Sequence, residues 1–306
     1  MPAPNPSHPT QATAGSAQPS LSKSDTTARA ANGTSASTAS HNGALERRVR
    51  RAAVAGSFYS GDRDTLKADV ETLLAAATSR HLPGLRALIC PHAGYQYSGP
   101  IAASGYKLLM GHGFERVVLL GPSHRVAFEG VALPDADALE TPLGPIDLDA
   151  EARTALLGEP FRVDAAPHAK EHSLEVQLPF LQLTLGRFSV VPLVFGDVDS
   201  GAVEKRLESL VDKKTLFIAS SDLSHYYPYA AAKVLDHATV QAILALDTEA
   251  MKTREACGKG PILALMQLAQ SRHWKPTLID QRNSGDTAGD RSRVVGYASI
   301  AFTETR

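Results

Sequence analysis

The stretch RALICPHAGY, residues 86–95, decides the fold of this chain. Its apolar run is short, continuous and bounded by Pro91 and Gly94, which favours a buried strand over a helix. A strand that is apolar on both faces is typical of a parallel sheet covered by helices. His92 then follows the carboxyl end of the predicted strand, which is where open α/β sheets bind their ligands.

The same pattern of apolar run, chain-breaking residue and histidine occurs twice more. RVVLLGPSH at residues 116–124 ends at His124, and TLFIASSDLSH at residues 215–225 ends at His225, with Asp222 three residues earlier. If the three strands are parallel neighbours, their polar ends meet at one edge of the sheet. Three such histidines, one accompanied by an aspartate, predict a shared metal or acid–base site.

Predicted strands and helices alternate around these three segments. This alternation predicts an α/β domain, a three-layer sandwich with a mostly parallel central sheet. Helical spacing or a helix start is found at residues 64–78, 98–109, 149–157, from 171 onward, 203–211, 230–246 and 261–268. Further strands are predicted at residues 128–134, 188–195, 278–281 and 294–302, and a loop at residues 140–145.

Composition excludes several classes of partner. The chain has 306 residues and a formal net charge of −1, so no basic excess indicates a nucleic-acid partner. No apolar run reaches the roughly 18 residues that a membrane-spanning helix needs. The two cysteines, Cys90 and Cys257, cannot build a disulfide framework. They fit a reducing compartment, so a cytoplasmic location is expected, and Cys90 is predicted to lie in the core.

The first 45 residues differ from the rest of the chain. They are rich in alanine, serine and threonine and contain scarcely any large apolar residue. Such a segment buries too little surface to offset its ordering entropy, so residues 1–45 are predicted to be a disordered tail and residues 46–306 the folded domain. The tail lacks the apolar region of a secretory signal. An organelle transit peptide is the alternative, although basic residues are few.

Cys257 allows two interpretations. It lies in EACGKGP, residues 255–261, before a predicted helix whose positive end and free N–H groups favour a thiolate. The alternative is a buried structural thiol. As a thiolate, it could join His92 and His124 in a three-ligand site with an open position, as catalytic metals use. Two imidazoles and a thiolate suit Fe(II), copper or zinc, and their spacing does not choose among these metals.

Asp222, His225 and His172 are the candidate catalytic residues. Each could orient a ligand, bind a second metal or act as an acid or base. Glu175 and Gln177, close to His172 in the sequence, are expected to fix local structure instead.

Other histidines and other signatures carry less information. His168 follows Pro167 in a polar stretch and is predicted to face solvent. The dinucleotide-binding, phosphate-loop, zinc-protease and serine-hydrolase motifs are all missing from the sequence. A hydrolase that uses Cys257 and a histidine at the edge of the sheet is a further hypothesis, but no local sequence motif supports it.

Six short motifs together resemble a known family. They are AGSFY at 55–59, PHAGY at 91–95, GPSH at 121–124, EHSLE at 171–175, SSDLSH at 220–225 and CG at 257–258. In this order they resemble the Memo family, whose prokaryotic branch is called AmmeMemoRadiSam system protein B. The resemblance covers roughly residues 47–303, and six motifs in family order are far more specific than one.

The resemblance implies a fold similar to class III extradiol ring-cleaving dioxygenases, which use a mononuclear iron. It implies a metal site of His92, His124 and Cys257, with Asp222 and His225 close by. In the dioxygenases the third iron ligand is a carboxylate, whereas a thiolate is itself oxidisable, which argues against ring cleavage. The resemblance also implies a functional association with radical-SAM and AMMECR-like proteins, and its eukaryotic members are described as redox and signalling proteins.

Two hypotheses of different classes follow. The first is an oxidoreductase that depends on iron or copper and acts on an unknown small molecule. The second is a non-catalytic protein that binds a metal or a peptide in a dioxygenase-like cleft. Turnover that is lost in His92→Ala would support the first hypothesis. Tight binding without turnover would support the second.

Overall fold

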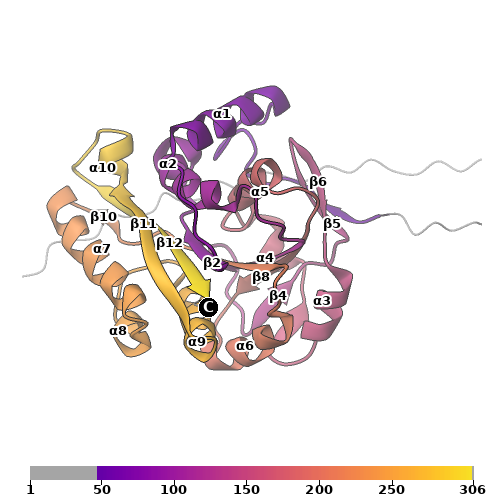
Figure 1. The fold of residues 1–306 in the computed structure, drawn as a ribbon. Helices are drawn as coiled ribbons and strands as arrows, with labels where there is room; N and C mark the ends of the chain where they lie inside the picture. Colours follow the sequence, from indigo (N-terminus) through magenta and orange to yellow (C-terminus); the bar gives the residue numbers. More distant parts are fainter. Residues whose placement is uncertain (1–46, 305–306) are drawn as a thin grey trace, which may run out of the picture. The chain divides into compact units, whose positions relative to one another are not determined.

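A nine-stranded sheet forms the centre of the structure, a computed structural model that describes residues 47–304 (Figure 1). The strand order is β10-β12-β2-β9-β3-β8-β4-β7, and β11 pairs with β12. The central strands are β2 (Leu85–Cys90), β9 (Thr215–Ser220), β3 (Arg116–Pro122) and β8 (Ser189–Phe195). The outer strands are β10 (His225–Tyr227), β11 (Trp274–Asn283), β12 (Val294–Glu304), β4 (Val131–Leu133) and β7 (Phe161–Val163).

The sheet is mixed, which corrects the expectation of a mostly parallel sheet. The four central strands are parallel, as the apolar runs predict. On one side, however, β12 runs antiparallel to β2, β10 and β11, and on the other side β4 runs antiparallel to β8. The connection between β11 and β12 is short and holds only α10 (Ser284–Thr287), and short connections favour antiparallel neighbours.

Side chains of the central strands alternate between two hydrophobic cores. In β3, Val118 and Leu120 face one core, and Val117 and Leu119 face the other; all four are fully buried. Both faces therefore need a helical layer, and Figure 1 shows helices on each side of the sheet. One layer holds α3 (Ala150–Leu156), α6 (Ser200–Leu207), α7 (Tyr229–Leu244), α8 (Thr248–Lys252) and α9 (Lys259–Ser271). The other holds α1 (Arg63–Ala76), α2 (Tyr95–Tyr106) and α5 (Leu178–Thr184).

The predicted loop at residues 140–145 is instead part of a small sheet. β5 (Ala138–Thr141) and β6 (Gly144–Asp147) form an antiparallel hairpin, and β1 (Val49–Arg50) pairs with β5. The turn residues that indicated a loop occupy only the tip of this hairpin, where Gly144 has a φ of 121°.

Helix α2 begins earlier than the sequence predicts. Its first residue is Tyr95, and Pro100 lies inside the helix instead of in its first turn. Tertiary contacts explain the earlier start, because the Tyr95 backbone N–H donates to the Phe58 carbonyl at 2.8 Å and its hydroxyl donates to the Val176 carbonyl at 2.7 Å. The helix therefore starts only three residues after His92 and fixes the loop that carries this histidine.

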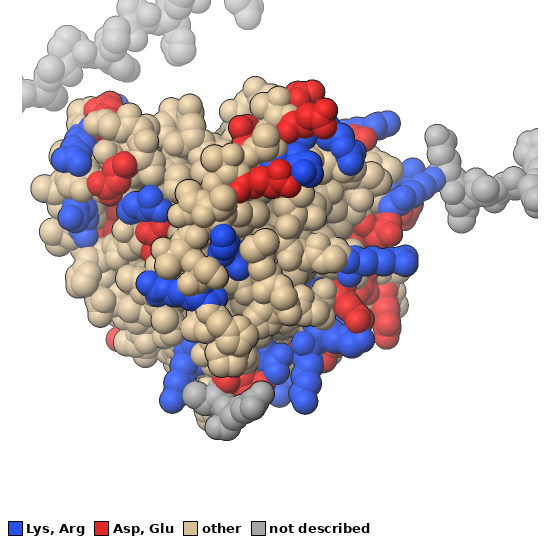
Figure 2. All heavy atoms as spheres, turned by 45° about the horizontal axis from the view of Figure 1, so that its top comes forward, with Lys and Arg blue, Asp and Glu red and all other residues tan. Residues whose placement is uncertain are grey.

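The surface and the termini add two observations. On the face drawn in Figure 2, Lys and Arg side chains alternate with Asp and Glu side chains, and neither sign forms a broad patch. Within residues 47–304, no helix has both the length and the apolar character needed to cross a membrane. The predicted tail at residues 1–45 lies outside the described residues, so it stays a prediction.

Candidate metal centre

Three histidines meet at the edge of the sheet. His92 follows β2, His124 follows β3, and His172 lies between α4 (Ala166–Ala169) and the 3-10 turn Glu175–Gln177. Each offers one ring nitrogen to a group whose members all lie within 4.8 Å of one another. The ring centroids of His92 and His124 are 5.1 Å apart, and those of His124 and His172 are 4.5 Å apart. Such a group could hold a metal ion.

Hydrogen bonds fix the protonation of the His92 ring. The Ser220 hydroxyl donates its single hydrogen to the Ser173 carbonyl at 2.6 Å, so it accepts from its other neighbours. Gln177 Nε2 donates to it at 2.7 Å, with the amide held in this orientation because Tyr106 donates to Gln177 Oε1. His92 Nδ1, 2.8 Å from the same oxygen, must therefore carry a hydrogen. The Nε2 atom of His92 is left with a free lone pair.

A buried carboxylate fixes His124 in the same way. Glu171 accepts from the His124 backbone N–H at 2.6 Å, from His124 Nδ1 at 2.9 Å and from the backbone of His172 and Ser173. Burial alone would raise the pKa of Glu171, but these hydrogen bonds, first that of the His124 ring, lower it to about 2. A carboxylate that accepts from Nδ1 leaves Nε2 of His124 as a lone-pair donor, as in many metal sites.

The third ring, that of His172, has an unsatisfied nitrogen. Its buried Nδ1 atom has no hydrogen-bond partner among the described residues and lies 3.3 Å from Glu171 Oε1. Burial lowers the pKa of His172 to about 4 and that of His92 well below its ordinary value, so both rings are neutral at pH 7. Metals bind neutral imidazole, and an unpaired buried polar atom is normally satisfied by some partner. The residues present therefore fit a metal ion.

Cys257 touches this group from one side without belonging to it. Its sulfur lies 3.1 Å from His92 Nε2 and accepts from the Asp222 backbone N–H at 3.2 Å. Because His92 Nε2 is an acceptor, the thiol donates to it. Burial, followed by the negative charge of Asp222, raises the pKa of Cys257 to about 12. Burial thus outweighs the helix end before α9, so of the two interpretations the thiol is the one favoured for the metal-free group.

Asp222 and His225 lie in the same region. Asp222 Oδ1 accepts from the backbone N–H of His92 at 2.8 Å, so the carboxyl group supports the loop of that histidine. Burial raises the pKa of Asp222 to about 7, although backbone hydrogen bonds from His92 and Ala93 oppose the rise. Burial also lowers the pKa of His225. Asp222 can therefore gain or lose a proton near neutral pH, as a general acid or base must.

A single cleft exposes these groups. Its volume is about 720 Å³, which is within the usual range for small-molecule sites. The lining includes the three imidazoles and both predicted acid–base residues, namely His92, His124, His172, Asp222 and His225. The structure thus brings together five of the six predicted site residues at one cleft, and the sixth, Cys257, contacts His92.

Sequence reasoning missed the residues that orient the rings. Glu171, Ser173 and Ser220 were not singled out, although a carboxylate next to His172 and a serine at the end of a predicted strand were visible signals. His168 was misplaced: it is buried, and its Nε2 lies 2.9 Å from the Ala132 carbonyl. The polar residues around His168 indicate an exposed loop, so its buried contact with Ala132 is not predictable from the local sequence.

The stability of metal-free protein should depend on pH through Asp222. Its folded pKa, about 7, exceeds its ordinary value of 3.8, so its contribution is complete below about pH 4 and is lost as pH rises through 7. Between pH 5 and 8 the wild type should therefore lose on the order of 2 kcal/mol relative to Asp222→Asn, which keeps an acceptor for His92. Urea unfolding in the presence of a chelator measures the difference. Parallel pH profiles for the two proteins would contradict this assignment.

Comparisons with known proteins identify the family. The family model described as Memo-like protein matches residues 50–301. MEMO1 family proteins of Sulfurisphaera tokodaii and Sulfolobus acidocaldarius are 35% and 37% identical to this chain, in each case over 83% of this chain and 99% of the relative. A MEMO1 family protein of Aquifex aeolicus is 36% identical over the same shares. The chain therefore belongs to the Memo family.

Proposed function

We propose that this chain is an oxidoreductase that depends on iron or copper and acts on a small molecule in the cleft at His92 and His124. The observation that carries the proposal is the pair of imidazoles whose Nε2 lone pairs are fixed by Ser220 and Glu171. Bound there, iron or copper would supply one-electron redox chemistry and polarise a substrate oxygen.

The residues of the chain supply the other parts of such a reaction. Asp222, with a pKa of about 7, holds or releases a proton beside the His92 loop. His225 lines the same cleft and is the second candidate for proton transfer. Phe58 packs on His172 with ring centroids 4.6 Å apart and limits the access of water to that ring.

The proposed ligands are His92, His124 and the Cys257 sulfur. The sulfur and His92 Nε2 are 3.1 Å apart, a little less than the separation expected of two ligands on one ion, so a small side-chain movement suffices. Metal binding would replace the proton of the buried thiol. His172 is the competing third ligand, favoured by its place in the group of three imidazoles.

Cobalt titration distinguishes the two third ligands. In metal-free protein, Co²⁺ bound to Cys257 should give a near-ultraviolet thiolate-to-metal charge-transfer band. We expect Cys257→Ser to remove this band and to weaken Co²⁺ binding by more than about 100-fold, the upper range for residues outside the ligand set. His172→Gln should keep the band. A wild-type complex without the band, combined with lost binding in His172→Gln, would assign the third position to His172.

Metal handling or peptide binding without turnover is the second candidate. It is favoured by Cys257, because a thiolate ligand is itself oxidisable and suits a site that holds or transfers a metal. Protein loaded with Fe²⁺ or Cu²⁺ should be incubated with oxygen and a panel of small reductants, with loaded His92→Ala as the control. Consumption that depends on His92 supports the oxidoreductase. Stoichiometric metal binding without any consumption supports the second candidate.

A further inference from the structure

The outer part of the cleft is built from aromatic rings. Phe58, Tyr97, Tyr226 and Tyr297 all line it, together with the imidazoles. Tyr97 and Tyr226 are 38% and 63% exposed, although exposed tyrosine rings bring no gain in the packing of this fold. Flat, partly apolar walls of this kind suit a flat ligand, because aromatic rings stack on one another with specific geometry.

A single cation lines this aromatic part, among the described residues. Arg293 lies between α10 and β12, and its guanidinium carbon is 5.2 Å from the centre of the Tyr226 ring. No described carboxylate lies within ion-pair distance of it. Its neighbour Arg291 differs, because Arg291 lies 4.0 Å from Asp286 and 4.4 Å from the Tyr229 ring centre. The N–H groups of Arg293 are therefore available to an anion in the cleft.

The acidic residue in the same wall is already engaged. Asp290 Oδ1 accepts from the Ser292 backbone N–H at 2.9 Å and from the Ser292 hydroxyl at 2.8 Å. These bonds lower the pKa of Asp290, and its carboxylate is hydrogen-bonded within its own turn. The mouth of the cleft thus offers an available positive charge and a negative charge that is already hydrogen-bonded.

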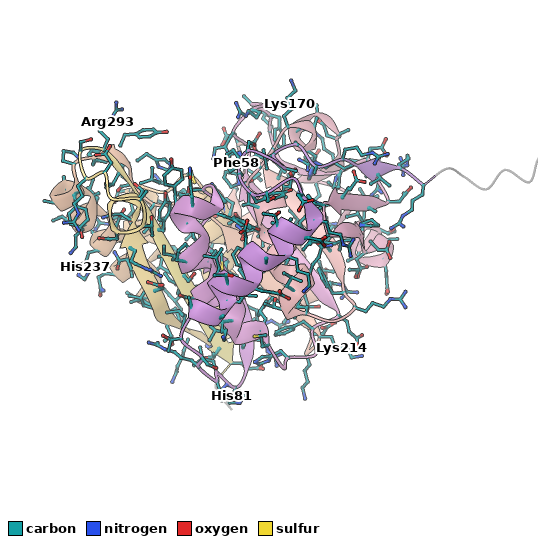
Figure 3. All side chains as sticks on the ribbon, turned by 90° about the horizontal axis from the view of Figure 1, so that it is seen from above. Phe58, His81, Lys170, Lys214, His237 and Arg293 are labelled. Carbon is teal, nitrogen blue, oxygen red and sulfur yellow. The ribbon has the colours of Figure 1, made fainter. Side chains whose placement is uncertain are left out.

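The segment that carries Arg293 is anchored at both ends. The Tyr229 backbone N–H donates to the Arg291 carbonyl at 3.1 Å, and the Val295 N–H donates to the Ser284 hydroxyl at 3.0 Å. In Figure 3, Arg293 lies at the upper left beside the C-terminal elements, drawn in yellow, and Phe58 lies nearer the centre of the view. Because both residues line the cleft, a ligand between them would contact segments that are far apart in the sequence.

The backbone at Tyr226 supports a ligand-binding role for this wall. Tyr226 has a φ of 64°, a left-handed conformation that is unfavourable for a bulky residue, and the pairing of β10 with β12 shifts register at this point. This conformation places the ring beside Arg293 at the mouth of the cleft. Strained backbone of this kind is concentrated at functional sites.

We propose that the cleft binds an aromatic carboxylate, with its ring between Phe58, Tyr97 and Tyr226 and its carboxylate on Arg293. The inference deepens the proposed function, and it rests on that function only in taking this cleft as the substrate site. The Arg293 end fixes the anionic group at the mouth, so the opposite edge of the ring would point towards the imidazoles.

Four small probes test the ligand class on metal-free protein. Benzoate has both the ring and the charge, benzamide lacks the charge, cyclohexanecarboxylate lacks the flat ring, and benzylamine reverses the charge. NMR titration gives a dissociation constant for each. We expect benzoate to bind about tenfold more tightly than benzamide and benzylamine, the scale of one charge-assisted hydrogen bond. We also expect it to bind more tightly than cyclohexanecarboxylate, which cannot stack on the aromatic walls. Equal binding of benzoate and benzamide, or a preference for benzylamine, would overturn the inference.

Two arginine variants locate the contact. Arg293→Gln should abolish the preference for benzoate over benzamide. Arg125→Gln removes another exposed charge, next to His124, that does not line the cleft, and it should leave the preference unchanged. Equal losses in both variants would indicate a general positive field and reject the Arg293 site. Because these titrations use metal-free protein, rejection of the Arg293 site would not bear on the proposed metal function. Equally, a protein that binds no metal would still give the same binding constants for the four probes.

Discussion

Replacement of His92 by alanine should reduce the metal content from about one ion per chain to nearly none. His92, like His124, belongs to both candidate ligand sets, and it is also the histidine that contacts Cys257. The ring is buried and held by Ser220, so no neighbouring side chain can take its place without a change in the loop. Elemental analysis of protein purified without an affinity tag gives the stoichiometry.

His237→Ala is the matched control for this experiment. His237 is exposed on α7, and Figure 3 shows it well away from Phe58, which lines the cleft. Its loss should leave the metal content unchanged. Wild-type stoichiometry in His92→Ala would remove His92 from the ligand set, and with it the proposed function. A similar melting temperature of the metal-free proteins would show that the variant has kept its fold.

Replacement of Glu175 by alanine should cost roughly 3–5 kcal/mol of unfolding free energy, the range for breaking a buried ion pair. Glu175 pairs with Arg50, and its side chain is only 1% exposed. It also accepts from the Tyr59 hydroxyl at 2.7 Å and from the backbone of Ala53 and Val54 at 2.8 and 2.9 Å. Removing the carboxylate leaves the buried Arg50 guanidinium without its counter-ion and three further donors without an acceptor.

Urea unfolding of the metal-free protein measures this loss, and Arg51→Ala is its control. Arg51 pairs with Glu140, but the Arg51 side chain is 80% exposed, so its removal should cost less than about 1 kcal/mol. A loss of unfolding free energy of similar size in both variants would mean that the contacts of Glu175 with residues 50–59 do not stabilise the fold. The result also concerns the metal centre, because Arg50 donates to the carbonyl of Glu171 at 2.7 Å.

The buried strands were predictable because their physical signal is local. β9 spans the predicted residues, Thr215–Ser220, and β8 begins one residue later than predicted. A continuous apolar run needs both faces covered, whichever way the neighbouring strands run. Strand direction at the sheet edges is not encoded in this way, so β12 and β4 are predicted as strands but their antiparallel direction is not.

The candidate site was predictable as a set of residue types but not as a geometry. Strand ends located His92 and His124, and the structure places them in one group with His172. The sequence alone does not rank His172 against Cys257 as the third ligand, because both lie in loops whose direction depends on distant packing. The assignment of Cys257 as a ligand therefore stays a prediction, as does the similarity to the dioxygenases.

The parallel pairing of β2 with β9 sets an order of events for a chain made from its N-terminus. Residues 87–90 pair with residues 217–220, and Ser220 is the group that fixes the tautomer of His92. Until β9 has been synthesised and inserted, His92 lacks that partner and is free to present either ring nitrogen. A fixed tautomer at His92 is thus a property of the completed sheet, and a nascent or truncated chain that ends before residue 220 would lack this control of the ring.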